Sequence, residues 1–434
     1  MIYNKDGPLH AGGRYPRLDG GANKTEVFLD GLFSTAAKKI KPSPLLELLD
    51  LGKKSGVISF AVGMPDPDIF PIEQLQKAAS VISREGKDIL QYGAAGGYPP
   101  LKSFLAEWTA PRMGRKLSTS ELLITAGSAQ VIDLLCWALL DRGDWVICEE
   151  PTFQGATGTM FNHGARFLTI PCDGEGMKVE LLPERIERIR ATGEPIKFIY
   201  TIVNFHNPLG CDLSLQRRAR LLEIARTYGI LILEDDPYGW VRFEGEDIPS
   251  LFSMDDSGLV VFSSTFSKIL APGTRVAWCA GREEIIRKMT VLKENVDTCT
   301  SVLAQAIVWE YCRLGYLDAF LPRIIDHYRK KRDGMETALK KYLPPDRVSW
   351  QKPGGGFFYW LTVPGIPAVQ LLEKALEKKV AFVPGNAFYP TGSGGLNNFR
   401  MCFTFASAEM TDLGVRYIGE AIREFEQEPG HKKS

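Results

Sequence analysis

The sequence lacks an excess of charge of either sign, paired cysteines and long apolar runs. Its 434 residues include 52 lysines and arginines against 52 aspartates and glutamates. A zero formal charge argues against nucleic acid or an anionic membrane as the main partner, because both are bound through basic surfaces. No stretch approaches the ~18 continuous apolar residues that a membrane-spanning helix needs. We therefore expect neither a nucleic-acid partner nor a membrane partner.

The eight cysteines include no C-x-x-C pair, and several lie in apolar runs, as Cys148 does after Trp145-Val-Ile. Such cysteines are typical of small buried hydrophobic residues in a reducing compartment, not of a disulfide framework. A zinc site is not expected without paired spacings. Residues 1–25 contain no apolar core of a signal peptide. The expectation is a cytoplasmic location and no bound metal.

What the sequence does contain, from about residue 120, is an alternation of short apolar runs with helical segments such as 129–140 and 215–228. The runs are mostly apolar throughout, as strands covered on both faces are. This pattern predicts an α/β fold with a mainly parallel seven-stranded sheet flanked by helices. The seven runs are 121–125, 145–149, 165–170, 197–203, 230–234, 259–263 and 275–280.

After residue 281 the alternation stops. Residues 283–342 have a mainly helical pattern, including a long helix around 301–332, and the last hundred residues mix strands with helices. We expect three parts: an N-terminal arm and first helix over 1–55, a large α/β domain over 56–320, and a smaller α+β domain over 321–434. The first helix is predicted over 45–51, and the last over 408–427.

A lysine and an arginine follow the strand predicted over 259–263, in the run Ser263-Ser-Thr-Phe-Ser-Lys268-Ile-Leu-Ala-Pro-Gly-Thr-Arg275. The segment lies at the carboxyl edge of the sheet, where open α/β folds bind ligands. Thr265 and Ser267 can donate hydrogen bonds to phosphate oxygens, and Arg275 can hold them bidentately. Desolvation and Arg275 lower the pKa of Lys268 and make it an amine nucleophile. The pattern suits a phosphate and an aldehyde bound close together, whereas the plainer interpretation is a surface lysine.

Acidic residues end another predicted strand, in the run Leu233-Glu-Asp235-Asp-Pro-Tyr238. Buried acids are unfavourable unless a positive group meets them, and a protonated pyridine nitrogen is such a group. A carboxylate that keeps this nitrogen protonated makes the ring an electron sink. Tyr238 can hydrogen-bond the phenolic oxygen of the same ring. The alternative is a pair of metal-binding carboxylates.

A third strand turns directly into a helix, in the run Ile-Thr-Ala-Gly127-Ser128-Ala129-Gln. The N–H groups at a helix N-terminus form an anion site, to which Ser128 adds a hydroxyl. Gly127 allows a close approach of the backbone. An ordinary strand–helix turn explains this motif equally well when it is taken alone.

Three single residues complete the set of candidates. Asn207, in Val203-Asn-Phe-His-Asn207, is a donor for the ring oxygen, and Phe153 offers a flat surface against a ring, although a core position explains it as well. Arg400 stands within the apolar run Asn398-Phe-Arg400-Met-Cys-Phe. A charge there must be exposed, paired or bound to an anion, and an amino-acid carboxylate would be held bidentately by it.

Together and in this order, these segments resemble those of fold-type I pyridoxal 5′-phosphate (PLP) aminotransferases, and most of all the kynurenine/2-aminoadipate branch of class I. Gly63-Met-Pro-Asp-Pro, Gln91-Tyr92-Gly and Pro384-Gly-Asn-Ala-Phe388 match as well. The resemblance covers roughly residues 40–425. It implies PLP bound as a Schiff base to Lys268. The implied catalytic residues are Lys268, Asp235 and Tyr238, and the other cofactor contacts are Ser128, Ala129, Phe153, Asn207, Thr265, Ser267, Arg275 and Tyr92.

For the substrates, the resemblance implies that Arg400 binds the carboxylate, with Gly63 and Phe358 beside it. Tyr92 reaches the phosphate in the partner subunit, which implies a homodimer with shared active sites. The expected reaction moves the amino group of an L-amino acid to a 2-oxo acid. The family's Asn-Pro-Ser-Pro-Ile-Arg is Lys41-Pro-Ser-Pro-Leu-Leu46 here. Loss of that arginine disfavours acidic donors and favours apolar or aromatic ones.

Two alternatives stay open at this point. A carbon–sulfur or other β-eliminating lyase on the same scaffold needs the same cofactor residues. A regulator built on an aminotransferase domain normally carries an N-terminal helix-turn-helix, and the first 40 residues are too few and too rich in glycine for one.

Overall fold

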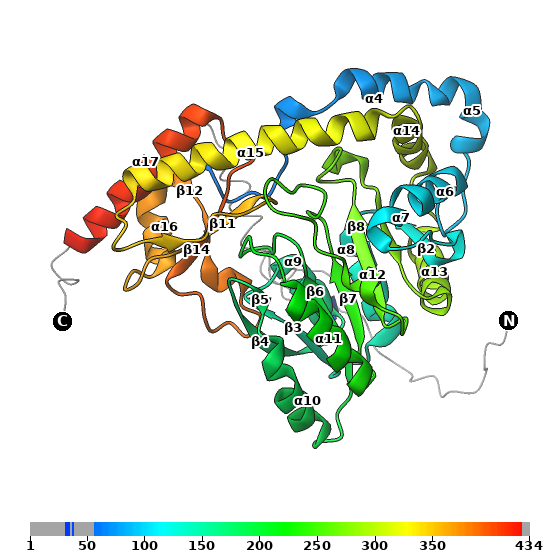
Figure 1. The fold of residues 1–434 in the computed structure, drawn as a ribbon, viewed down its shortest axis with the longest axis horizontal. Helices are drawn as coiled ribbons and strands as arrows, with labels where there is room; N and C mark the ends of the chain where they lie inside the picture. Colours follow the sequence, from blue (N-terminus) through cyan, green and yellow to red (C-terminus); the bar gives the residue numbers. More distant parts are fainter. Residues whose placement is uncertain (1–30, 35–36, 39–55, 428–434) are drawn as a thin grey trace, which may run out of the picture. The chain divides into compact units, whose positions relative to one another are not determined.

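The computed structural model describes residues 31–34, 37–38 and 56–427. Residues 44–434 group as one compact unit, drawn as a ribbon in Figure 1. The helix predicted over 45–51 and its Leu46 lie outside the described residues. Among the described helices, none is long and apolar enough to cross a bilayer. The domain boundary expected at residue 320 stays a prediction.

Eight strands form the central sheet, in the order β2-β9-β8-β7-β6-β3-β4-β5. The strands from β8 to β4 are parallel, whereas β9 runs antiparallel to β2 and β8, and β5 runs antiparallel to β4. The mainly parallel α/β sheet is therefore confirmed, and each predicted run corresponds to a strand. The additional strand, β5, has 2 residues, too few for a recognisable period. The strands are β2 (Leu122–Thr125), β3 (Trp145–Glu150), β4 (Arg166–Asp173), β5 (Gly176–Met177), β6 (Ile196–Ile202), β7 (Leu231–Asp235), β8 (Val260–Thr265) and β9 (Ala277–Ala280).

Neighbouring residues along these strands belong to two different hydrophobic cores, one on each face of the sheet. In β7, Ile232 lies in the first core and Leu233 in the second, and Trp278 and Cys279 divide in the same way in β9. Because successive side chains of a strand point to opposite faces, both faces are covered only when every position is apolar. This explains the continuous apolar runs in the sequence.

Helices cover both faces of the sheet (Figure 1). The second core is covered by α8 (Ser128–Leu139), α9 (Gln154–Asn162) and α13 (Glu283–Asp297). The first core is covered by α6 (Pro99–Trp108), α7 (Ala110–Met113), α10 (Leu182–Arg190), α11 (Leu215–Tyr228) and α12 (Leu251–Met254). The predicted limits of α11 are confirmed, because Ser214 caps its N-terminus and Gly229 ends it in the left-handed conformation.

A second, antiparallel sheet of four strands lies in the C-terminal part, in the order β10-β11-β14-β13. Its strands are β10 (Ser349–Trp350), β11 (Phe358–Thr362), β13 (Val383–Pro384) and β14 (Asn398–Cys402). The short strand β1 (Ile58–Ser59) pairs in parallel with β12 (Val380–Ala381). The helices of this part are α15 (Tyr316–Tyr342), α16 (Ala368–Glu377) and α17 (Ala408–Gln427), and α15 runs along the molecule towards α17 (Figure 1). The predicted mixture of strands and helices is confirmed.

One predicted helix has the wrong limits. The long helix expected around 301–332 is two helices, α14 (Val302–Arg313) and α15, because Gly315 takes a left-handed φ of 73° between them. Two further helices, α4 (Ile72–Ala79) and α5 (Val81–Ile89), were not expected from the sequence pattern and pack against α14.

Candidate active site

A cavity of about 330 Å³ lies where β6, β7 and β8 end and β14 passes. This volume is in the range of small-molecule sites. All of the predicted site residues line it except Tyr92, whose side chain is 79% exposed elsewhere on the surface. The predicted residues in the lining are Gly63, Ser128, Ala129, Phe153, Asn207, Asp235, Tyr238, Thr265, Ser267, Lys268, Arg275, Phe358 and Arg400.

Lys268 follows β8 and is half-buried. Its Nζ donates a hydrogen bond to the carbonyl oxygen of Gly63 at 2.9 Å. Burial, together with the charges of Arg400 and Arg275, lowers the pKa of Lys268 to about 8. A substantial fraction of the amine is therefore unprotonated, and nucleophilic, near neutral pH. A Cβ at residue 63 would lie 2.8 Å from the ring of Phe358. Glycine at this position therefore allows the backbone to pack directly against that ring.

Asp235 is the last residue of β7 and is 3% exposed. The hydroxyl of Tyr200 donates to its Oδ2 at 2.9 Å, whereas its buried Oδ1 has no hydrogen-bond partner among the described residues. Burial, helped by the neighbouring charge of Asp236 and opposed by the hydrogen bond from Tyr200, raises the pKa of Asp235 to about 7. A carboxylate placed in this way is stabilised by a positive group that enters the cavity.

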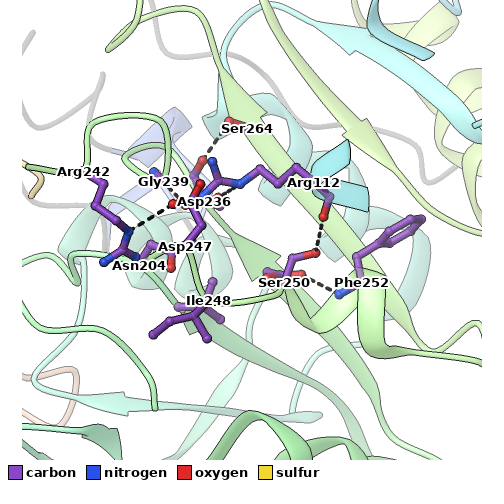
Figure 2. A network of polar contacts seen from close by, with 12 residues as sticks. Arg112, Asn204, Asp236, Gly239, Arg242, Asp247, Ile248, Ser250, Phe252 and Ser264 are labelled. Carbon is purple, nitrogen blue, oxygen red and sulfur yellow. Dashed lines mark hydrogen bonds and ion pairs between the residues drawn. The ribbon is translucent and has the colours of Figure 1, made fainter. Parts of the chain in front are cut away.

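The three consecutive acids at the end of β7 have three different surroundings. Glu234 accepts hydrogen bonds from the N–H groups of Leu251 and Phe252 at 2.9 and 2.8 Å, at the start of α12. Asp236 accepts one from the N–H of Gly239 at 2.9 Å and lies 3.5 Å from the Nε of Arg112. Figure 2 shows Asp236 and Arg112 turned towards each other.

Only Asp235 of the three lines the cavity. Glu234 and Asp236 are engaged by α12 and by Arg112, so they do not form a pair of carboxylates with Asp235 at the cavity. The acids at the end of β7 therefore offer one carboxylate, not two, to a ligand.

Another group of lining residues suits an anion. Ser128 and Ala129 begin α8, so the unpaired N–H groups of this helix face the cavity. The hydroxyl groups of Thr265 and Ser267 lie 2.9 Å apart beside them. Arg275 donates to the carbonyl of Ala126 at 3.1 Å and forms no ion pair among the described residues. Gly127 has a φ of 95°, and a Cβ there would lie 2.0 Å from the Nη2 of Arg275.

Arg400 approaches the cavity from β14 and is 2% exposed. Its Nη1 donates to the Oδ1 of Asn207 at 2.8 Å, and its Nη2 donates to the carbonyl of Ala61 at 2.5 Å. The guanidinium lies over the ring of Phe358, 4.2 Å from its centroid. Burial lowers the pKa of Arg400 to about 10, and no carboxylate of the described residues pairs with it. A buried cation of this kind calls for an anionic ligand.

Several residues of the site had not been expected from the sequence. Tyr200, which donates to Asp235 but does not line the cavity, lies within a predicted strand and had no feature that separated it from a core tyrosine. The others are apolar and lie in segments next to predicted site residues, so only their positions beside the motifs could have indicated them. They are Val62, Met64, Ile202, Pro237 and Pro272.

The family model for aminotransferases of class I and II matches residues 55–418. The chain belongs to this family. It is 40% identical to the aromatic-amino-acid aminotransferase 1 of Thermococcus litoralis, over 90% of this chain and 94% of the relative. It is 37% identical to the 2-aminoadipate transaminase of Thermus thermophilus, over 90% and 96%.

Among solved structures, the kynurenine aminotransferase of Pyrococcus horikoshii, in complex with PMP, superposes with a TM-score of 0.88 and 38% identity, over 92% of this chain and 99% of that one. This aminotransferase is therefore a PLP-dependent transaminase, and its substrates are amino acids and 2-oxo acids. The residues present fit the cofactor: an amine, a buried carboxylate oxygen without a partner and an anion site line one cavity.

Proposed function

We propose that this aminotransferase takes the amino group from an apolar or aromatic L-amino acid and gives it to a 2-oxo acid. The proposal rests on one observation. The Lys268 amine, the unpartnered Oδ1 of Asp235 and the Arg400 guanidinium, which has no carboxylate partner, all line the same cavity.

The residues around Lys268 divide into groups that suit the parts of PLP. Asp235 would pair with the pyridine nitrogen, Tyr238 and Asn207 would donate to the ring oxygen, and Phe153 would face the ring. The phosphate would be held at the anion site by Ser128, Ala129, Thr265, Ser267 and Arg275, all of which line the cavity. Bound there, PLP supplies an electron sink for the charge that develops at the α-carbon of the substrate.

The chain's own groups do the rest. Lys268 carries the proton between the α-carbon and the cofactor, and its pKa near 8 suits both uptake and release of that proton near neutral pH. Arg400 holds the carboxylate of either substrate through a charge-assisted pair. Two of the five N–H donors of its guanidinium bind Asn207 and Ala61, so three are left to bind a substrate carboxylate.

The cavity wall supports the choice of an apolar or aromatic donor. Lys268, Arg275 and Arg400 are the cations in the described lining, and each already has a role in the proposal. No cation of the lining is left for an acidic side chain, whereas Val62, Met64 and Phe358 offer apolar contact. The relative from Thermococcus litoralis, named for aromatic amino acids, agrees with this choice.

A panel of amino acids with 2-oxoglutarate tests the proposal. The rate of 2-oxo acid formation is expected to be highest for aromatic and large apolar donors and lowest for glutamate and 2-aminoadipate. A preference for the acidic donors would refute the substrate class. In the same panel, pyruvate and ammonia released from a cysteine conjugate would instead mark the β-eliminating lyase that the sequence left open. The three relatives described above are named as aminotransferases or transaminases.

A homodimer with shared active sites is part of the proposal. Tyr92 is 79% exposed, and Leu90, two residues earlier, is 67% exposed, which suits a surface that a second copy covers. Tyr92 of one copy then contacts the phosphate in the other. Substitution Tyr92→Phe is expected to weaken PLP binding without changing the mass measured by light scattering. Unchanged PLP affinity, or a monomer in the wild type, would refute this assignment. A cytoplasmic location stays a prediction.

A further inference from the structure

Residues 61–66, here called the wall segment, contribute Val62, Gly63 and Met64 to the cavity lining. Three backbone carbonyl groups of the segment accept hydrogen bonds from side chains elsewhere in the chain. The carbonyl of Ala61 accepts from Arg400 at 2.5 Å, that of Gly63 accepts from Lys268 at 2.9 Å, and that of Met64 accepts from the hydroxyl of Thr404 at 2.5 Å. The wall segment is therefore in direct contact with both cations on the substrate side of the site.

Asp66 ends the wall segment and binds to α15. Its carboxylate is 4% exposed in the folded chain, and its Oδ2 lies 2.5 Å from the Nζ of Lys331 and 2.9 Å from the Nε2 of His327. The N–H of Asp66 donates to the hydroxyl of Tyr328, at 3.2 Å. Lys331 also donates to the carbonyl of Ala406, at 3.0 Å. One turn of α15 thus holds the end of the segment through three successive contacts.

This attachment is energetically significant because the carboxylate is buried. Burial by itself raises the pKa of Asp66, but the hydrogen bonds from Lys331 and His327 outweigh it and keep the pKa below its ordinary value. The carboxylate is thus ionised when Lys331 holds it. Removing one partner of a buried pair leaves the other uncompensated, so the segment would be released from α15.

The cofactor contacts depend on other elements. Asp235 belongs to β7, Thr265 to β8 and Ser128 to α8. None of these residues contacts Asp66, His327 or Lys331. Loosening the wall segment should therefore disturb the positions of Arg400 and Lys268 and leave in place the contacts proposed for the pyridine nitrogen and the phosphate.

We propose that Asp66, held by Lys331 and His327, is a positioning residue that sets the wall segment against Arg400 and Lys268 and so determines how tightly both substrates are bound. This inference rests on the proposed roles of Arg400 and Lys268. Asp66 and Lys331 do not line the cavity themselves. They would act on Arg400 and Lys268 through the backbone carbonyl groups of residues 61–64.

The test compares Asp66→Asn and Lys331→Met with Lys330→Met as the matched control. Lys330 is the next residue of α15, but its side chain is 76% exposed and pairs with the exposed Asp326. Lys331→Arg keeps the charge and should restore function. For each holoenzyme we would measure PLP affinity by visible absorbance, the thermal midpoint, and kcat and KM for the amino acid and the 2-oxo acid.

KM for both substrates is expected to rise by about tenfold or more in Asp66→Asn and Lys331→Met, since a misplaced wall weakens substrate positioning. PLP affinity should stay within about twofold, as expected for contacts on separate elements. Lys331→Arg should recover most of the loss, and Lys330→Met should match the wild type.

The proposal would be overturned if KM were unchanged in both variants, or if it rose no more than in Lys330→Met. It would also be overturned if PLP affinity fell by as large a factor as KM rose. A lower thermal midpoint with unchanged KM would identify Asp66 as purely structural and would overturn it too. If instead the wild type fails to transaminate any amino acid, the proposed function fails, and the two failures are thereby distinguished.

Discussion

Replacement of Arg400 by methionine tests the substrate side of the site most directly. Methionine keeps much of the apolar stem but removes the guanidinium, which lies over the Phe358 ring and has no carboxylate partner in the described chain. Loss of one partner of a desolvated charge pair costs about 2–5 kcal/mol. Because about 1.4 kcal/mol corresponds to a factor of ten, kcat/KM for an amino acid should fall about 30- to 4000-fold.

The fall in Arg400→Met should appear mainly in KM, and it should be similar for the amino acid and the 2-oxo acid, because both present a carboxylate. Steady-state kinetics with an aromatic amino acid and 2-oxoglutarate give both values. The amine that lacks the carboxylate serves as a substrate control, and its slow reaction should change little. Arg416→Met is the matched protein control, since Arg416 is 45% exposed and pairs with Glu420 on the surface. An unchanged kcat/KM, or an equal loss for the amine, would remove Arg400 from the carboxylate site.

Three further outcomes are expected. Lys268→Ala should lose both turnover and the visible absorption band of the lysine-bound cofactor, and a variant that kept both would contradict the assignment. The cofactor-free protein should bind PLP covalently faster as the pH rises through about 8, because the unprotonated Lys268 amine is the nucleophile and its pKa is lowered to about that value. Stopped-flow absorbance measures this rate. A rate that does not change across this pH range would refute the lowered pKa. Gly127→Ala should lower the free energy of unfolding in urea by about 1–3 kcal/mol, because the φ of residue 127 is 95°. It should also weaken PLP binding, because the new Cβ would meet Arg275. Unchanged stability and PLP affinity would show that the close approach of residue 127 to Arg275 is unnecessary.

Much of the fold could be predicted because its signals are local. The strands of the central sheet are buried on both faces, so each is a continuous apolar run bounded by polar turns. The limits of α11 follow from a serine cap and a glycine stop. Gly315 is also a local signal, but the apolar period continues across it, and the break between α14 and α15 was therefore missed.

The site was predictable where its residues stand at the ends of strands, and not where partners come from distant parts of the chain. The acids at 234–236 indicated a positive partner, but which of them faces the cavity depends on Arg112 and on the start of α12. Asp66 and Lys331 are separated by most of the sequence, and neither has a neighbour that marks it. Long-range pairs of this kind become visible only when the chain is folded.

The three acids at the end of β7 also limit how this part of the chain can evolve. They are chemically alike, yet one caps a helix, one presents an unpartnered oxygen to the cavity and one pairs with an arginine. A single-residue insertion or deletion within β7 would shift every side chain to the opposite face and exchange these three tasks at once. Point changes may be tested there one at a time in a library, but the length of this strand should be invariant among functional descendants of the chain.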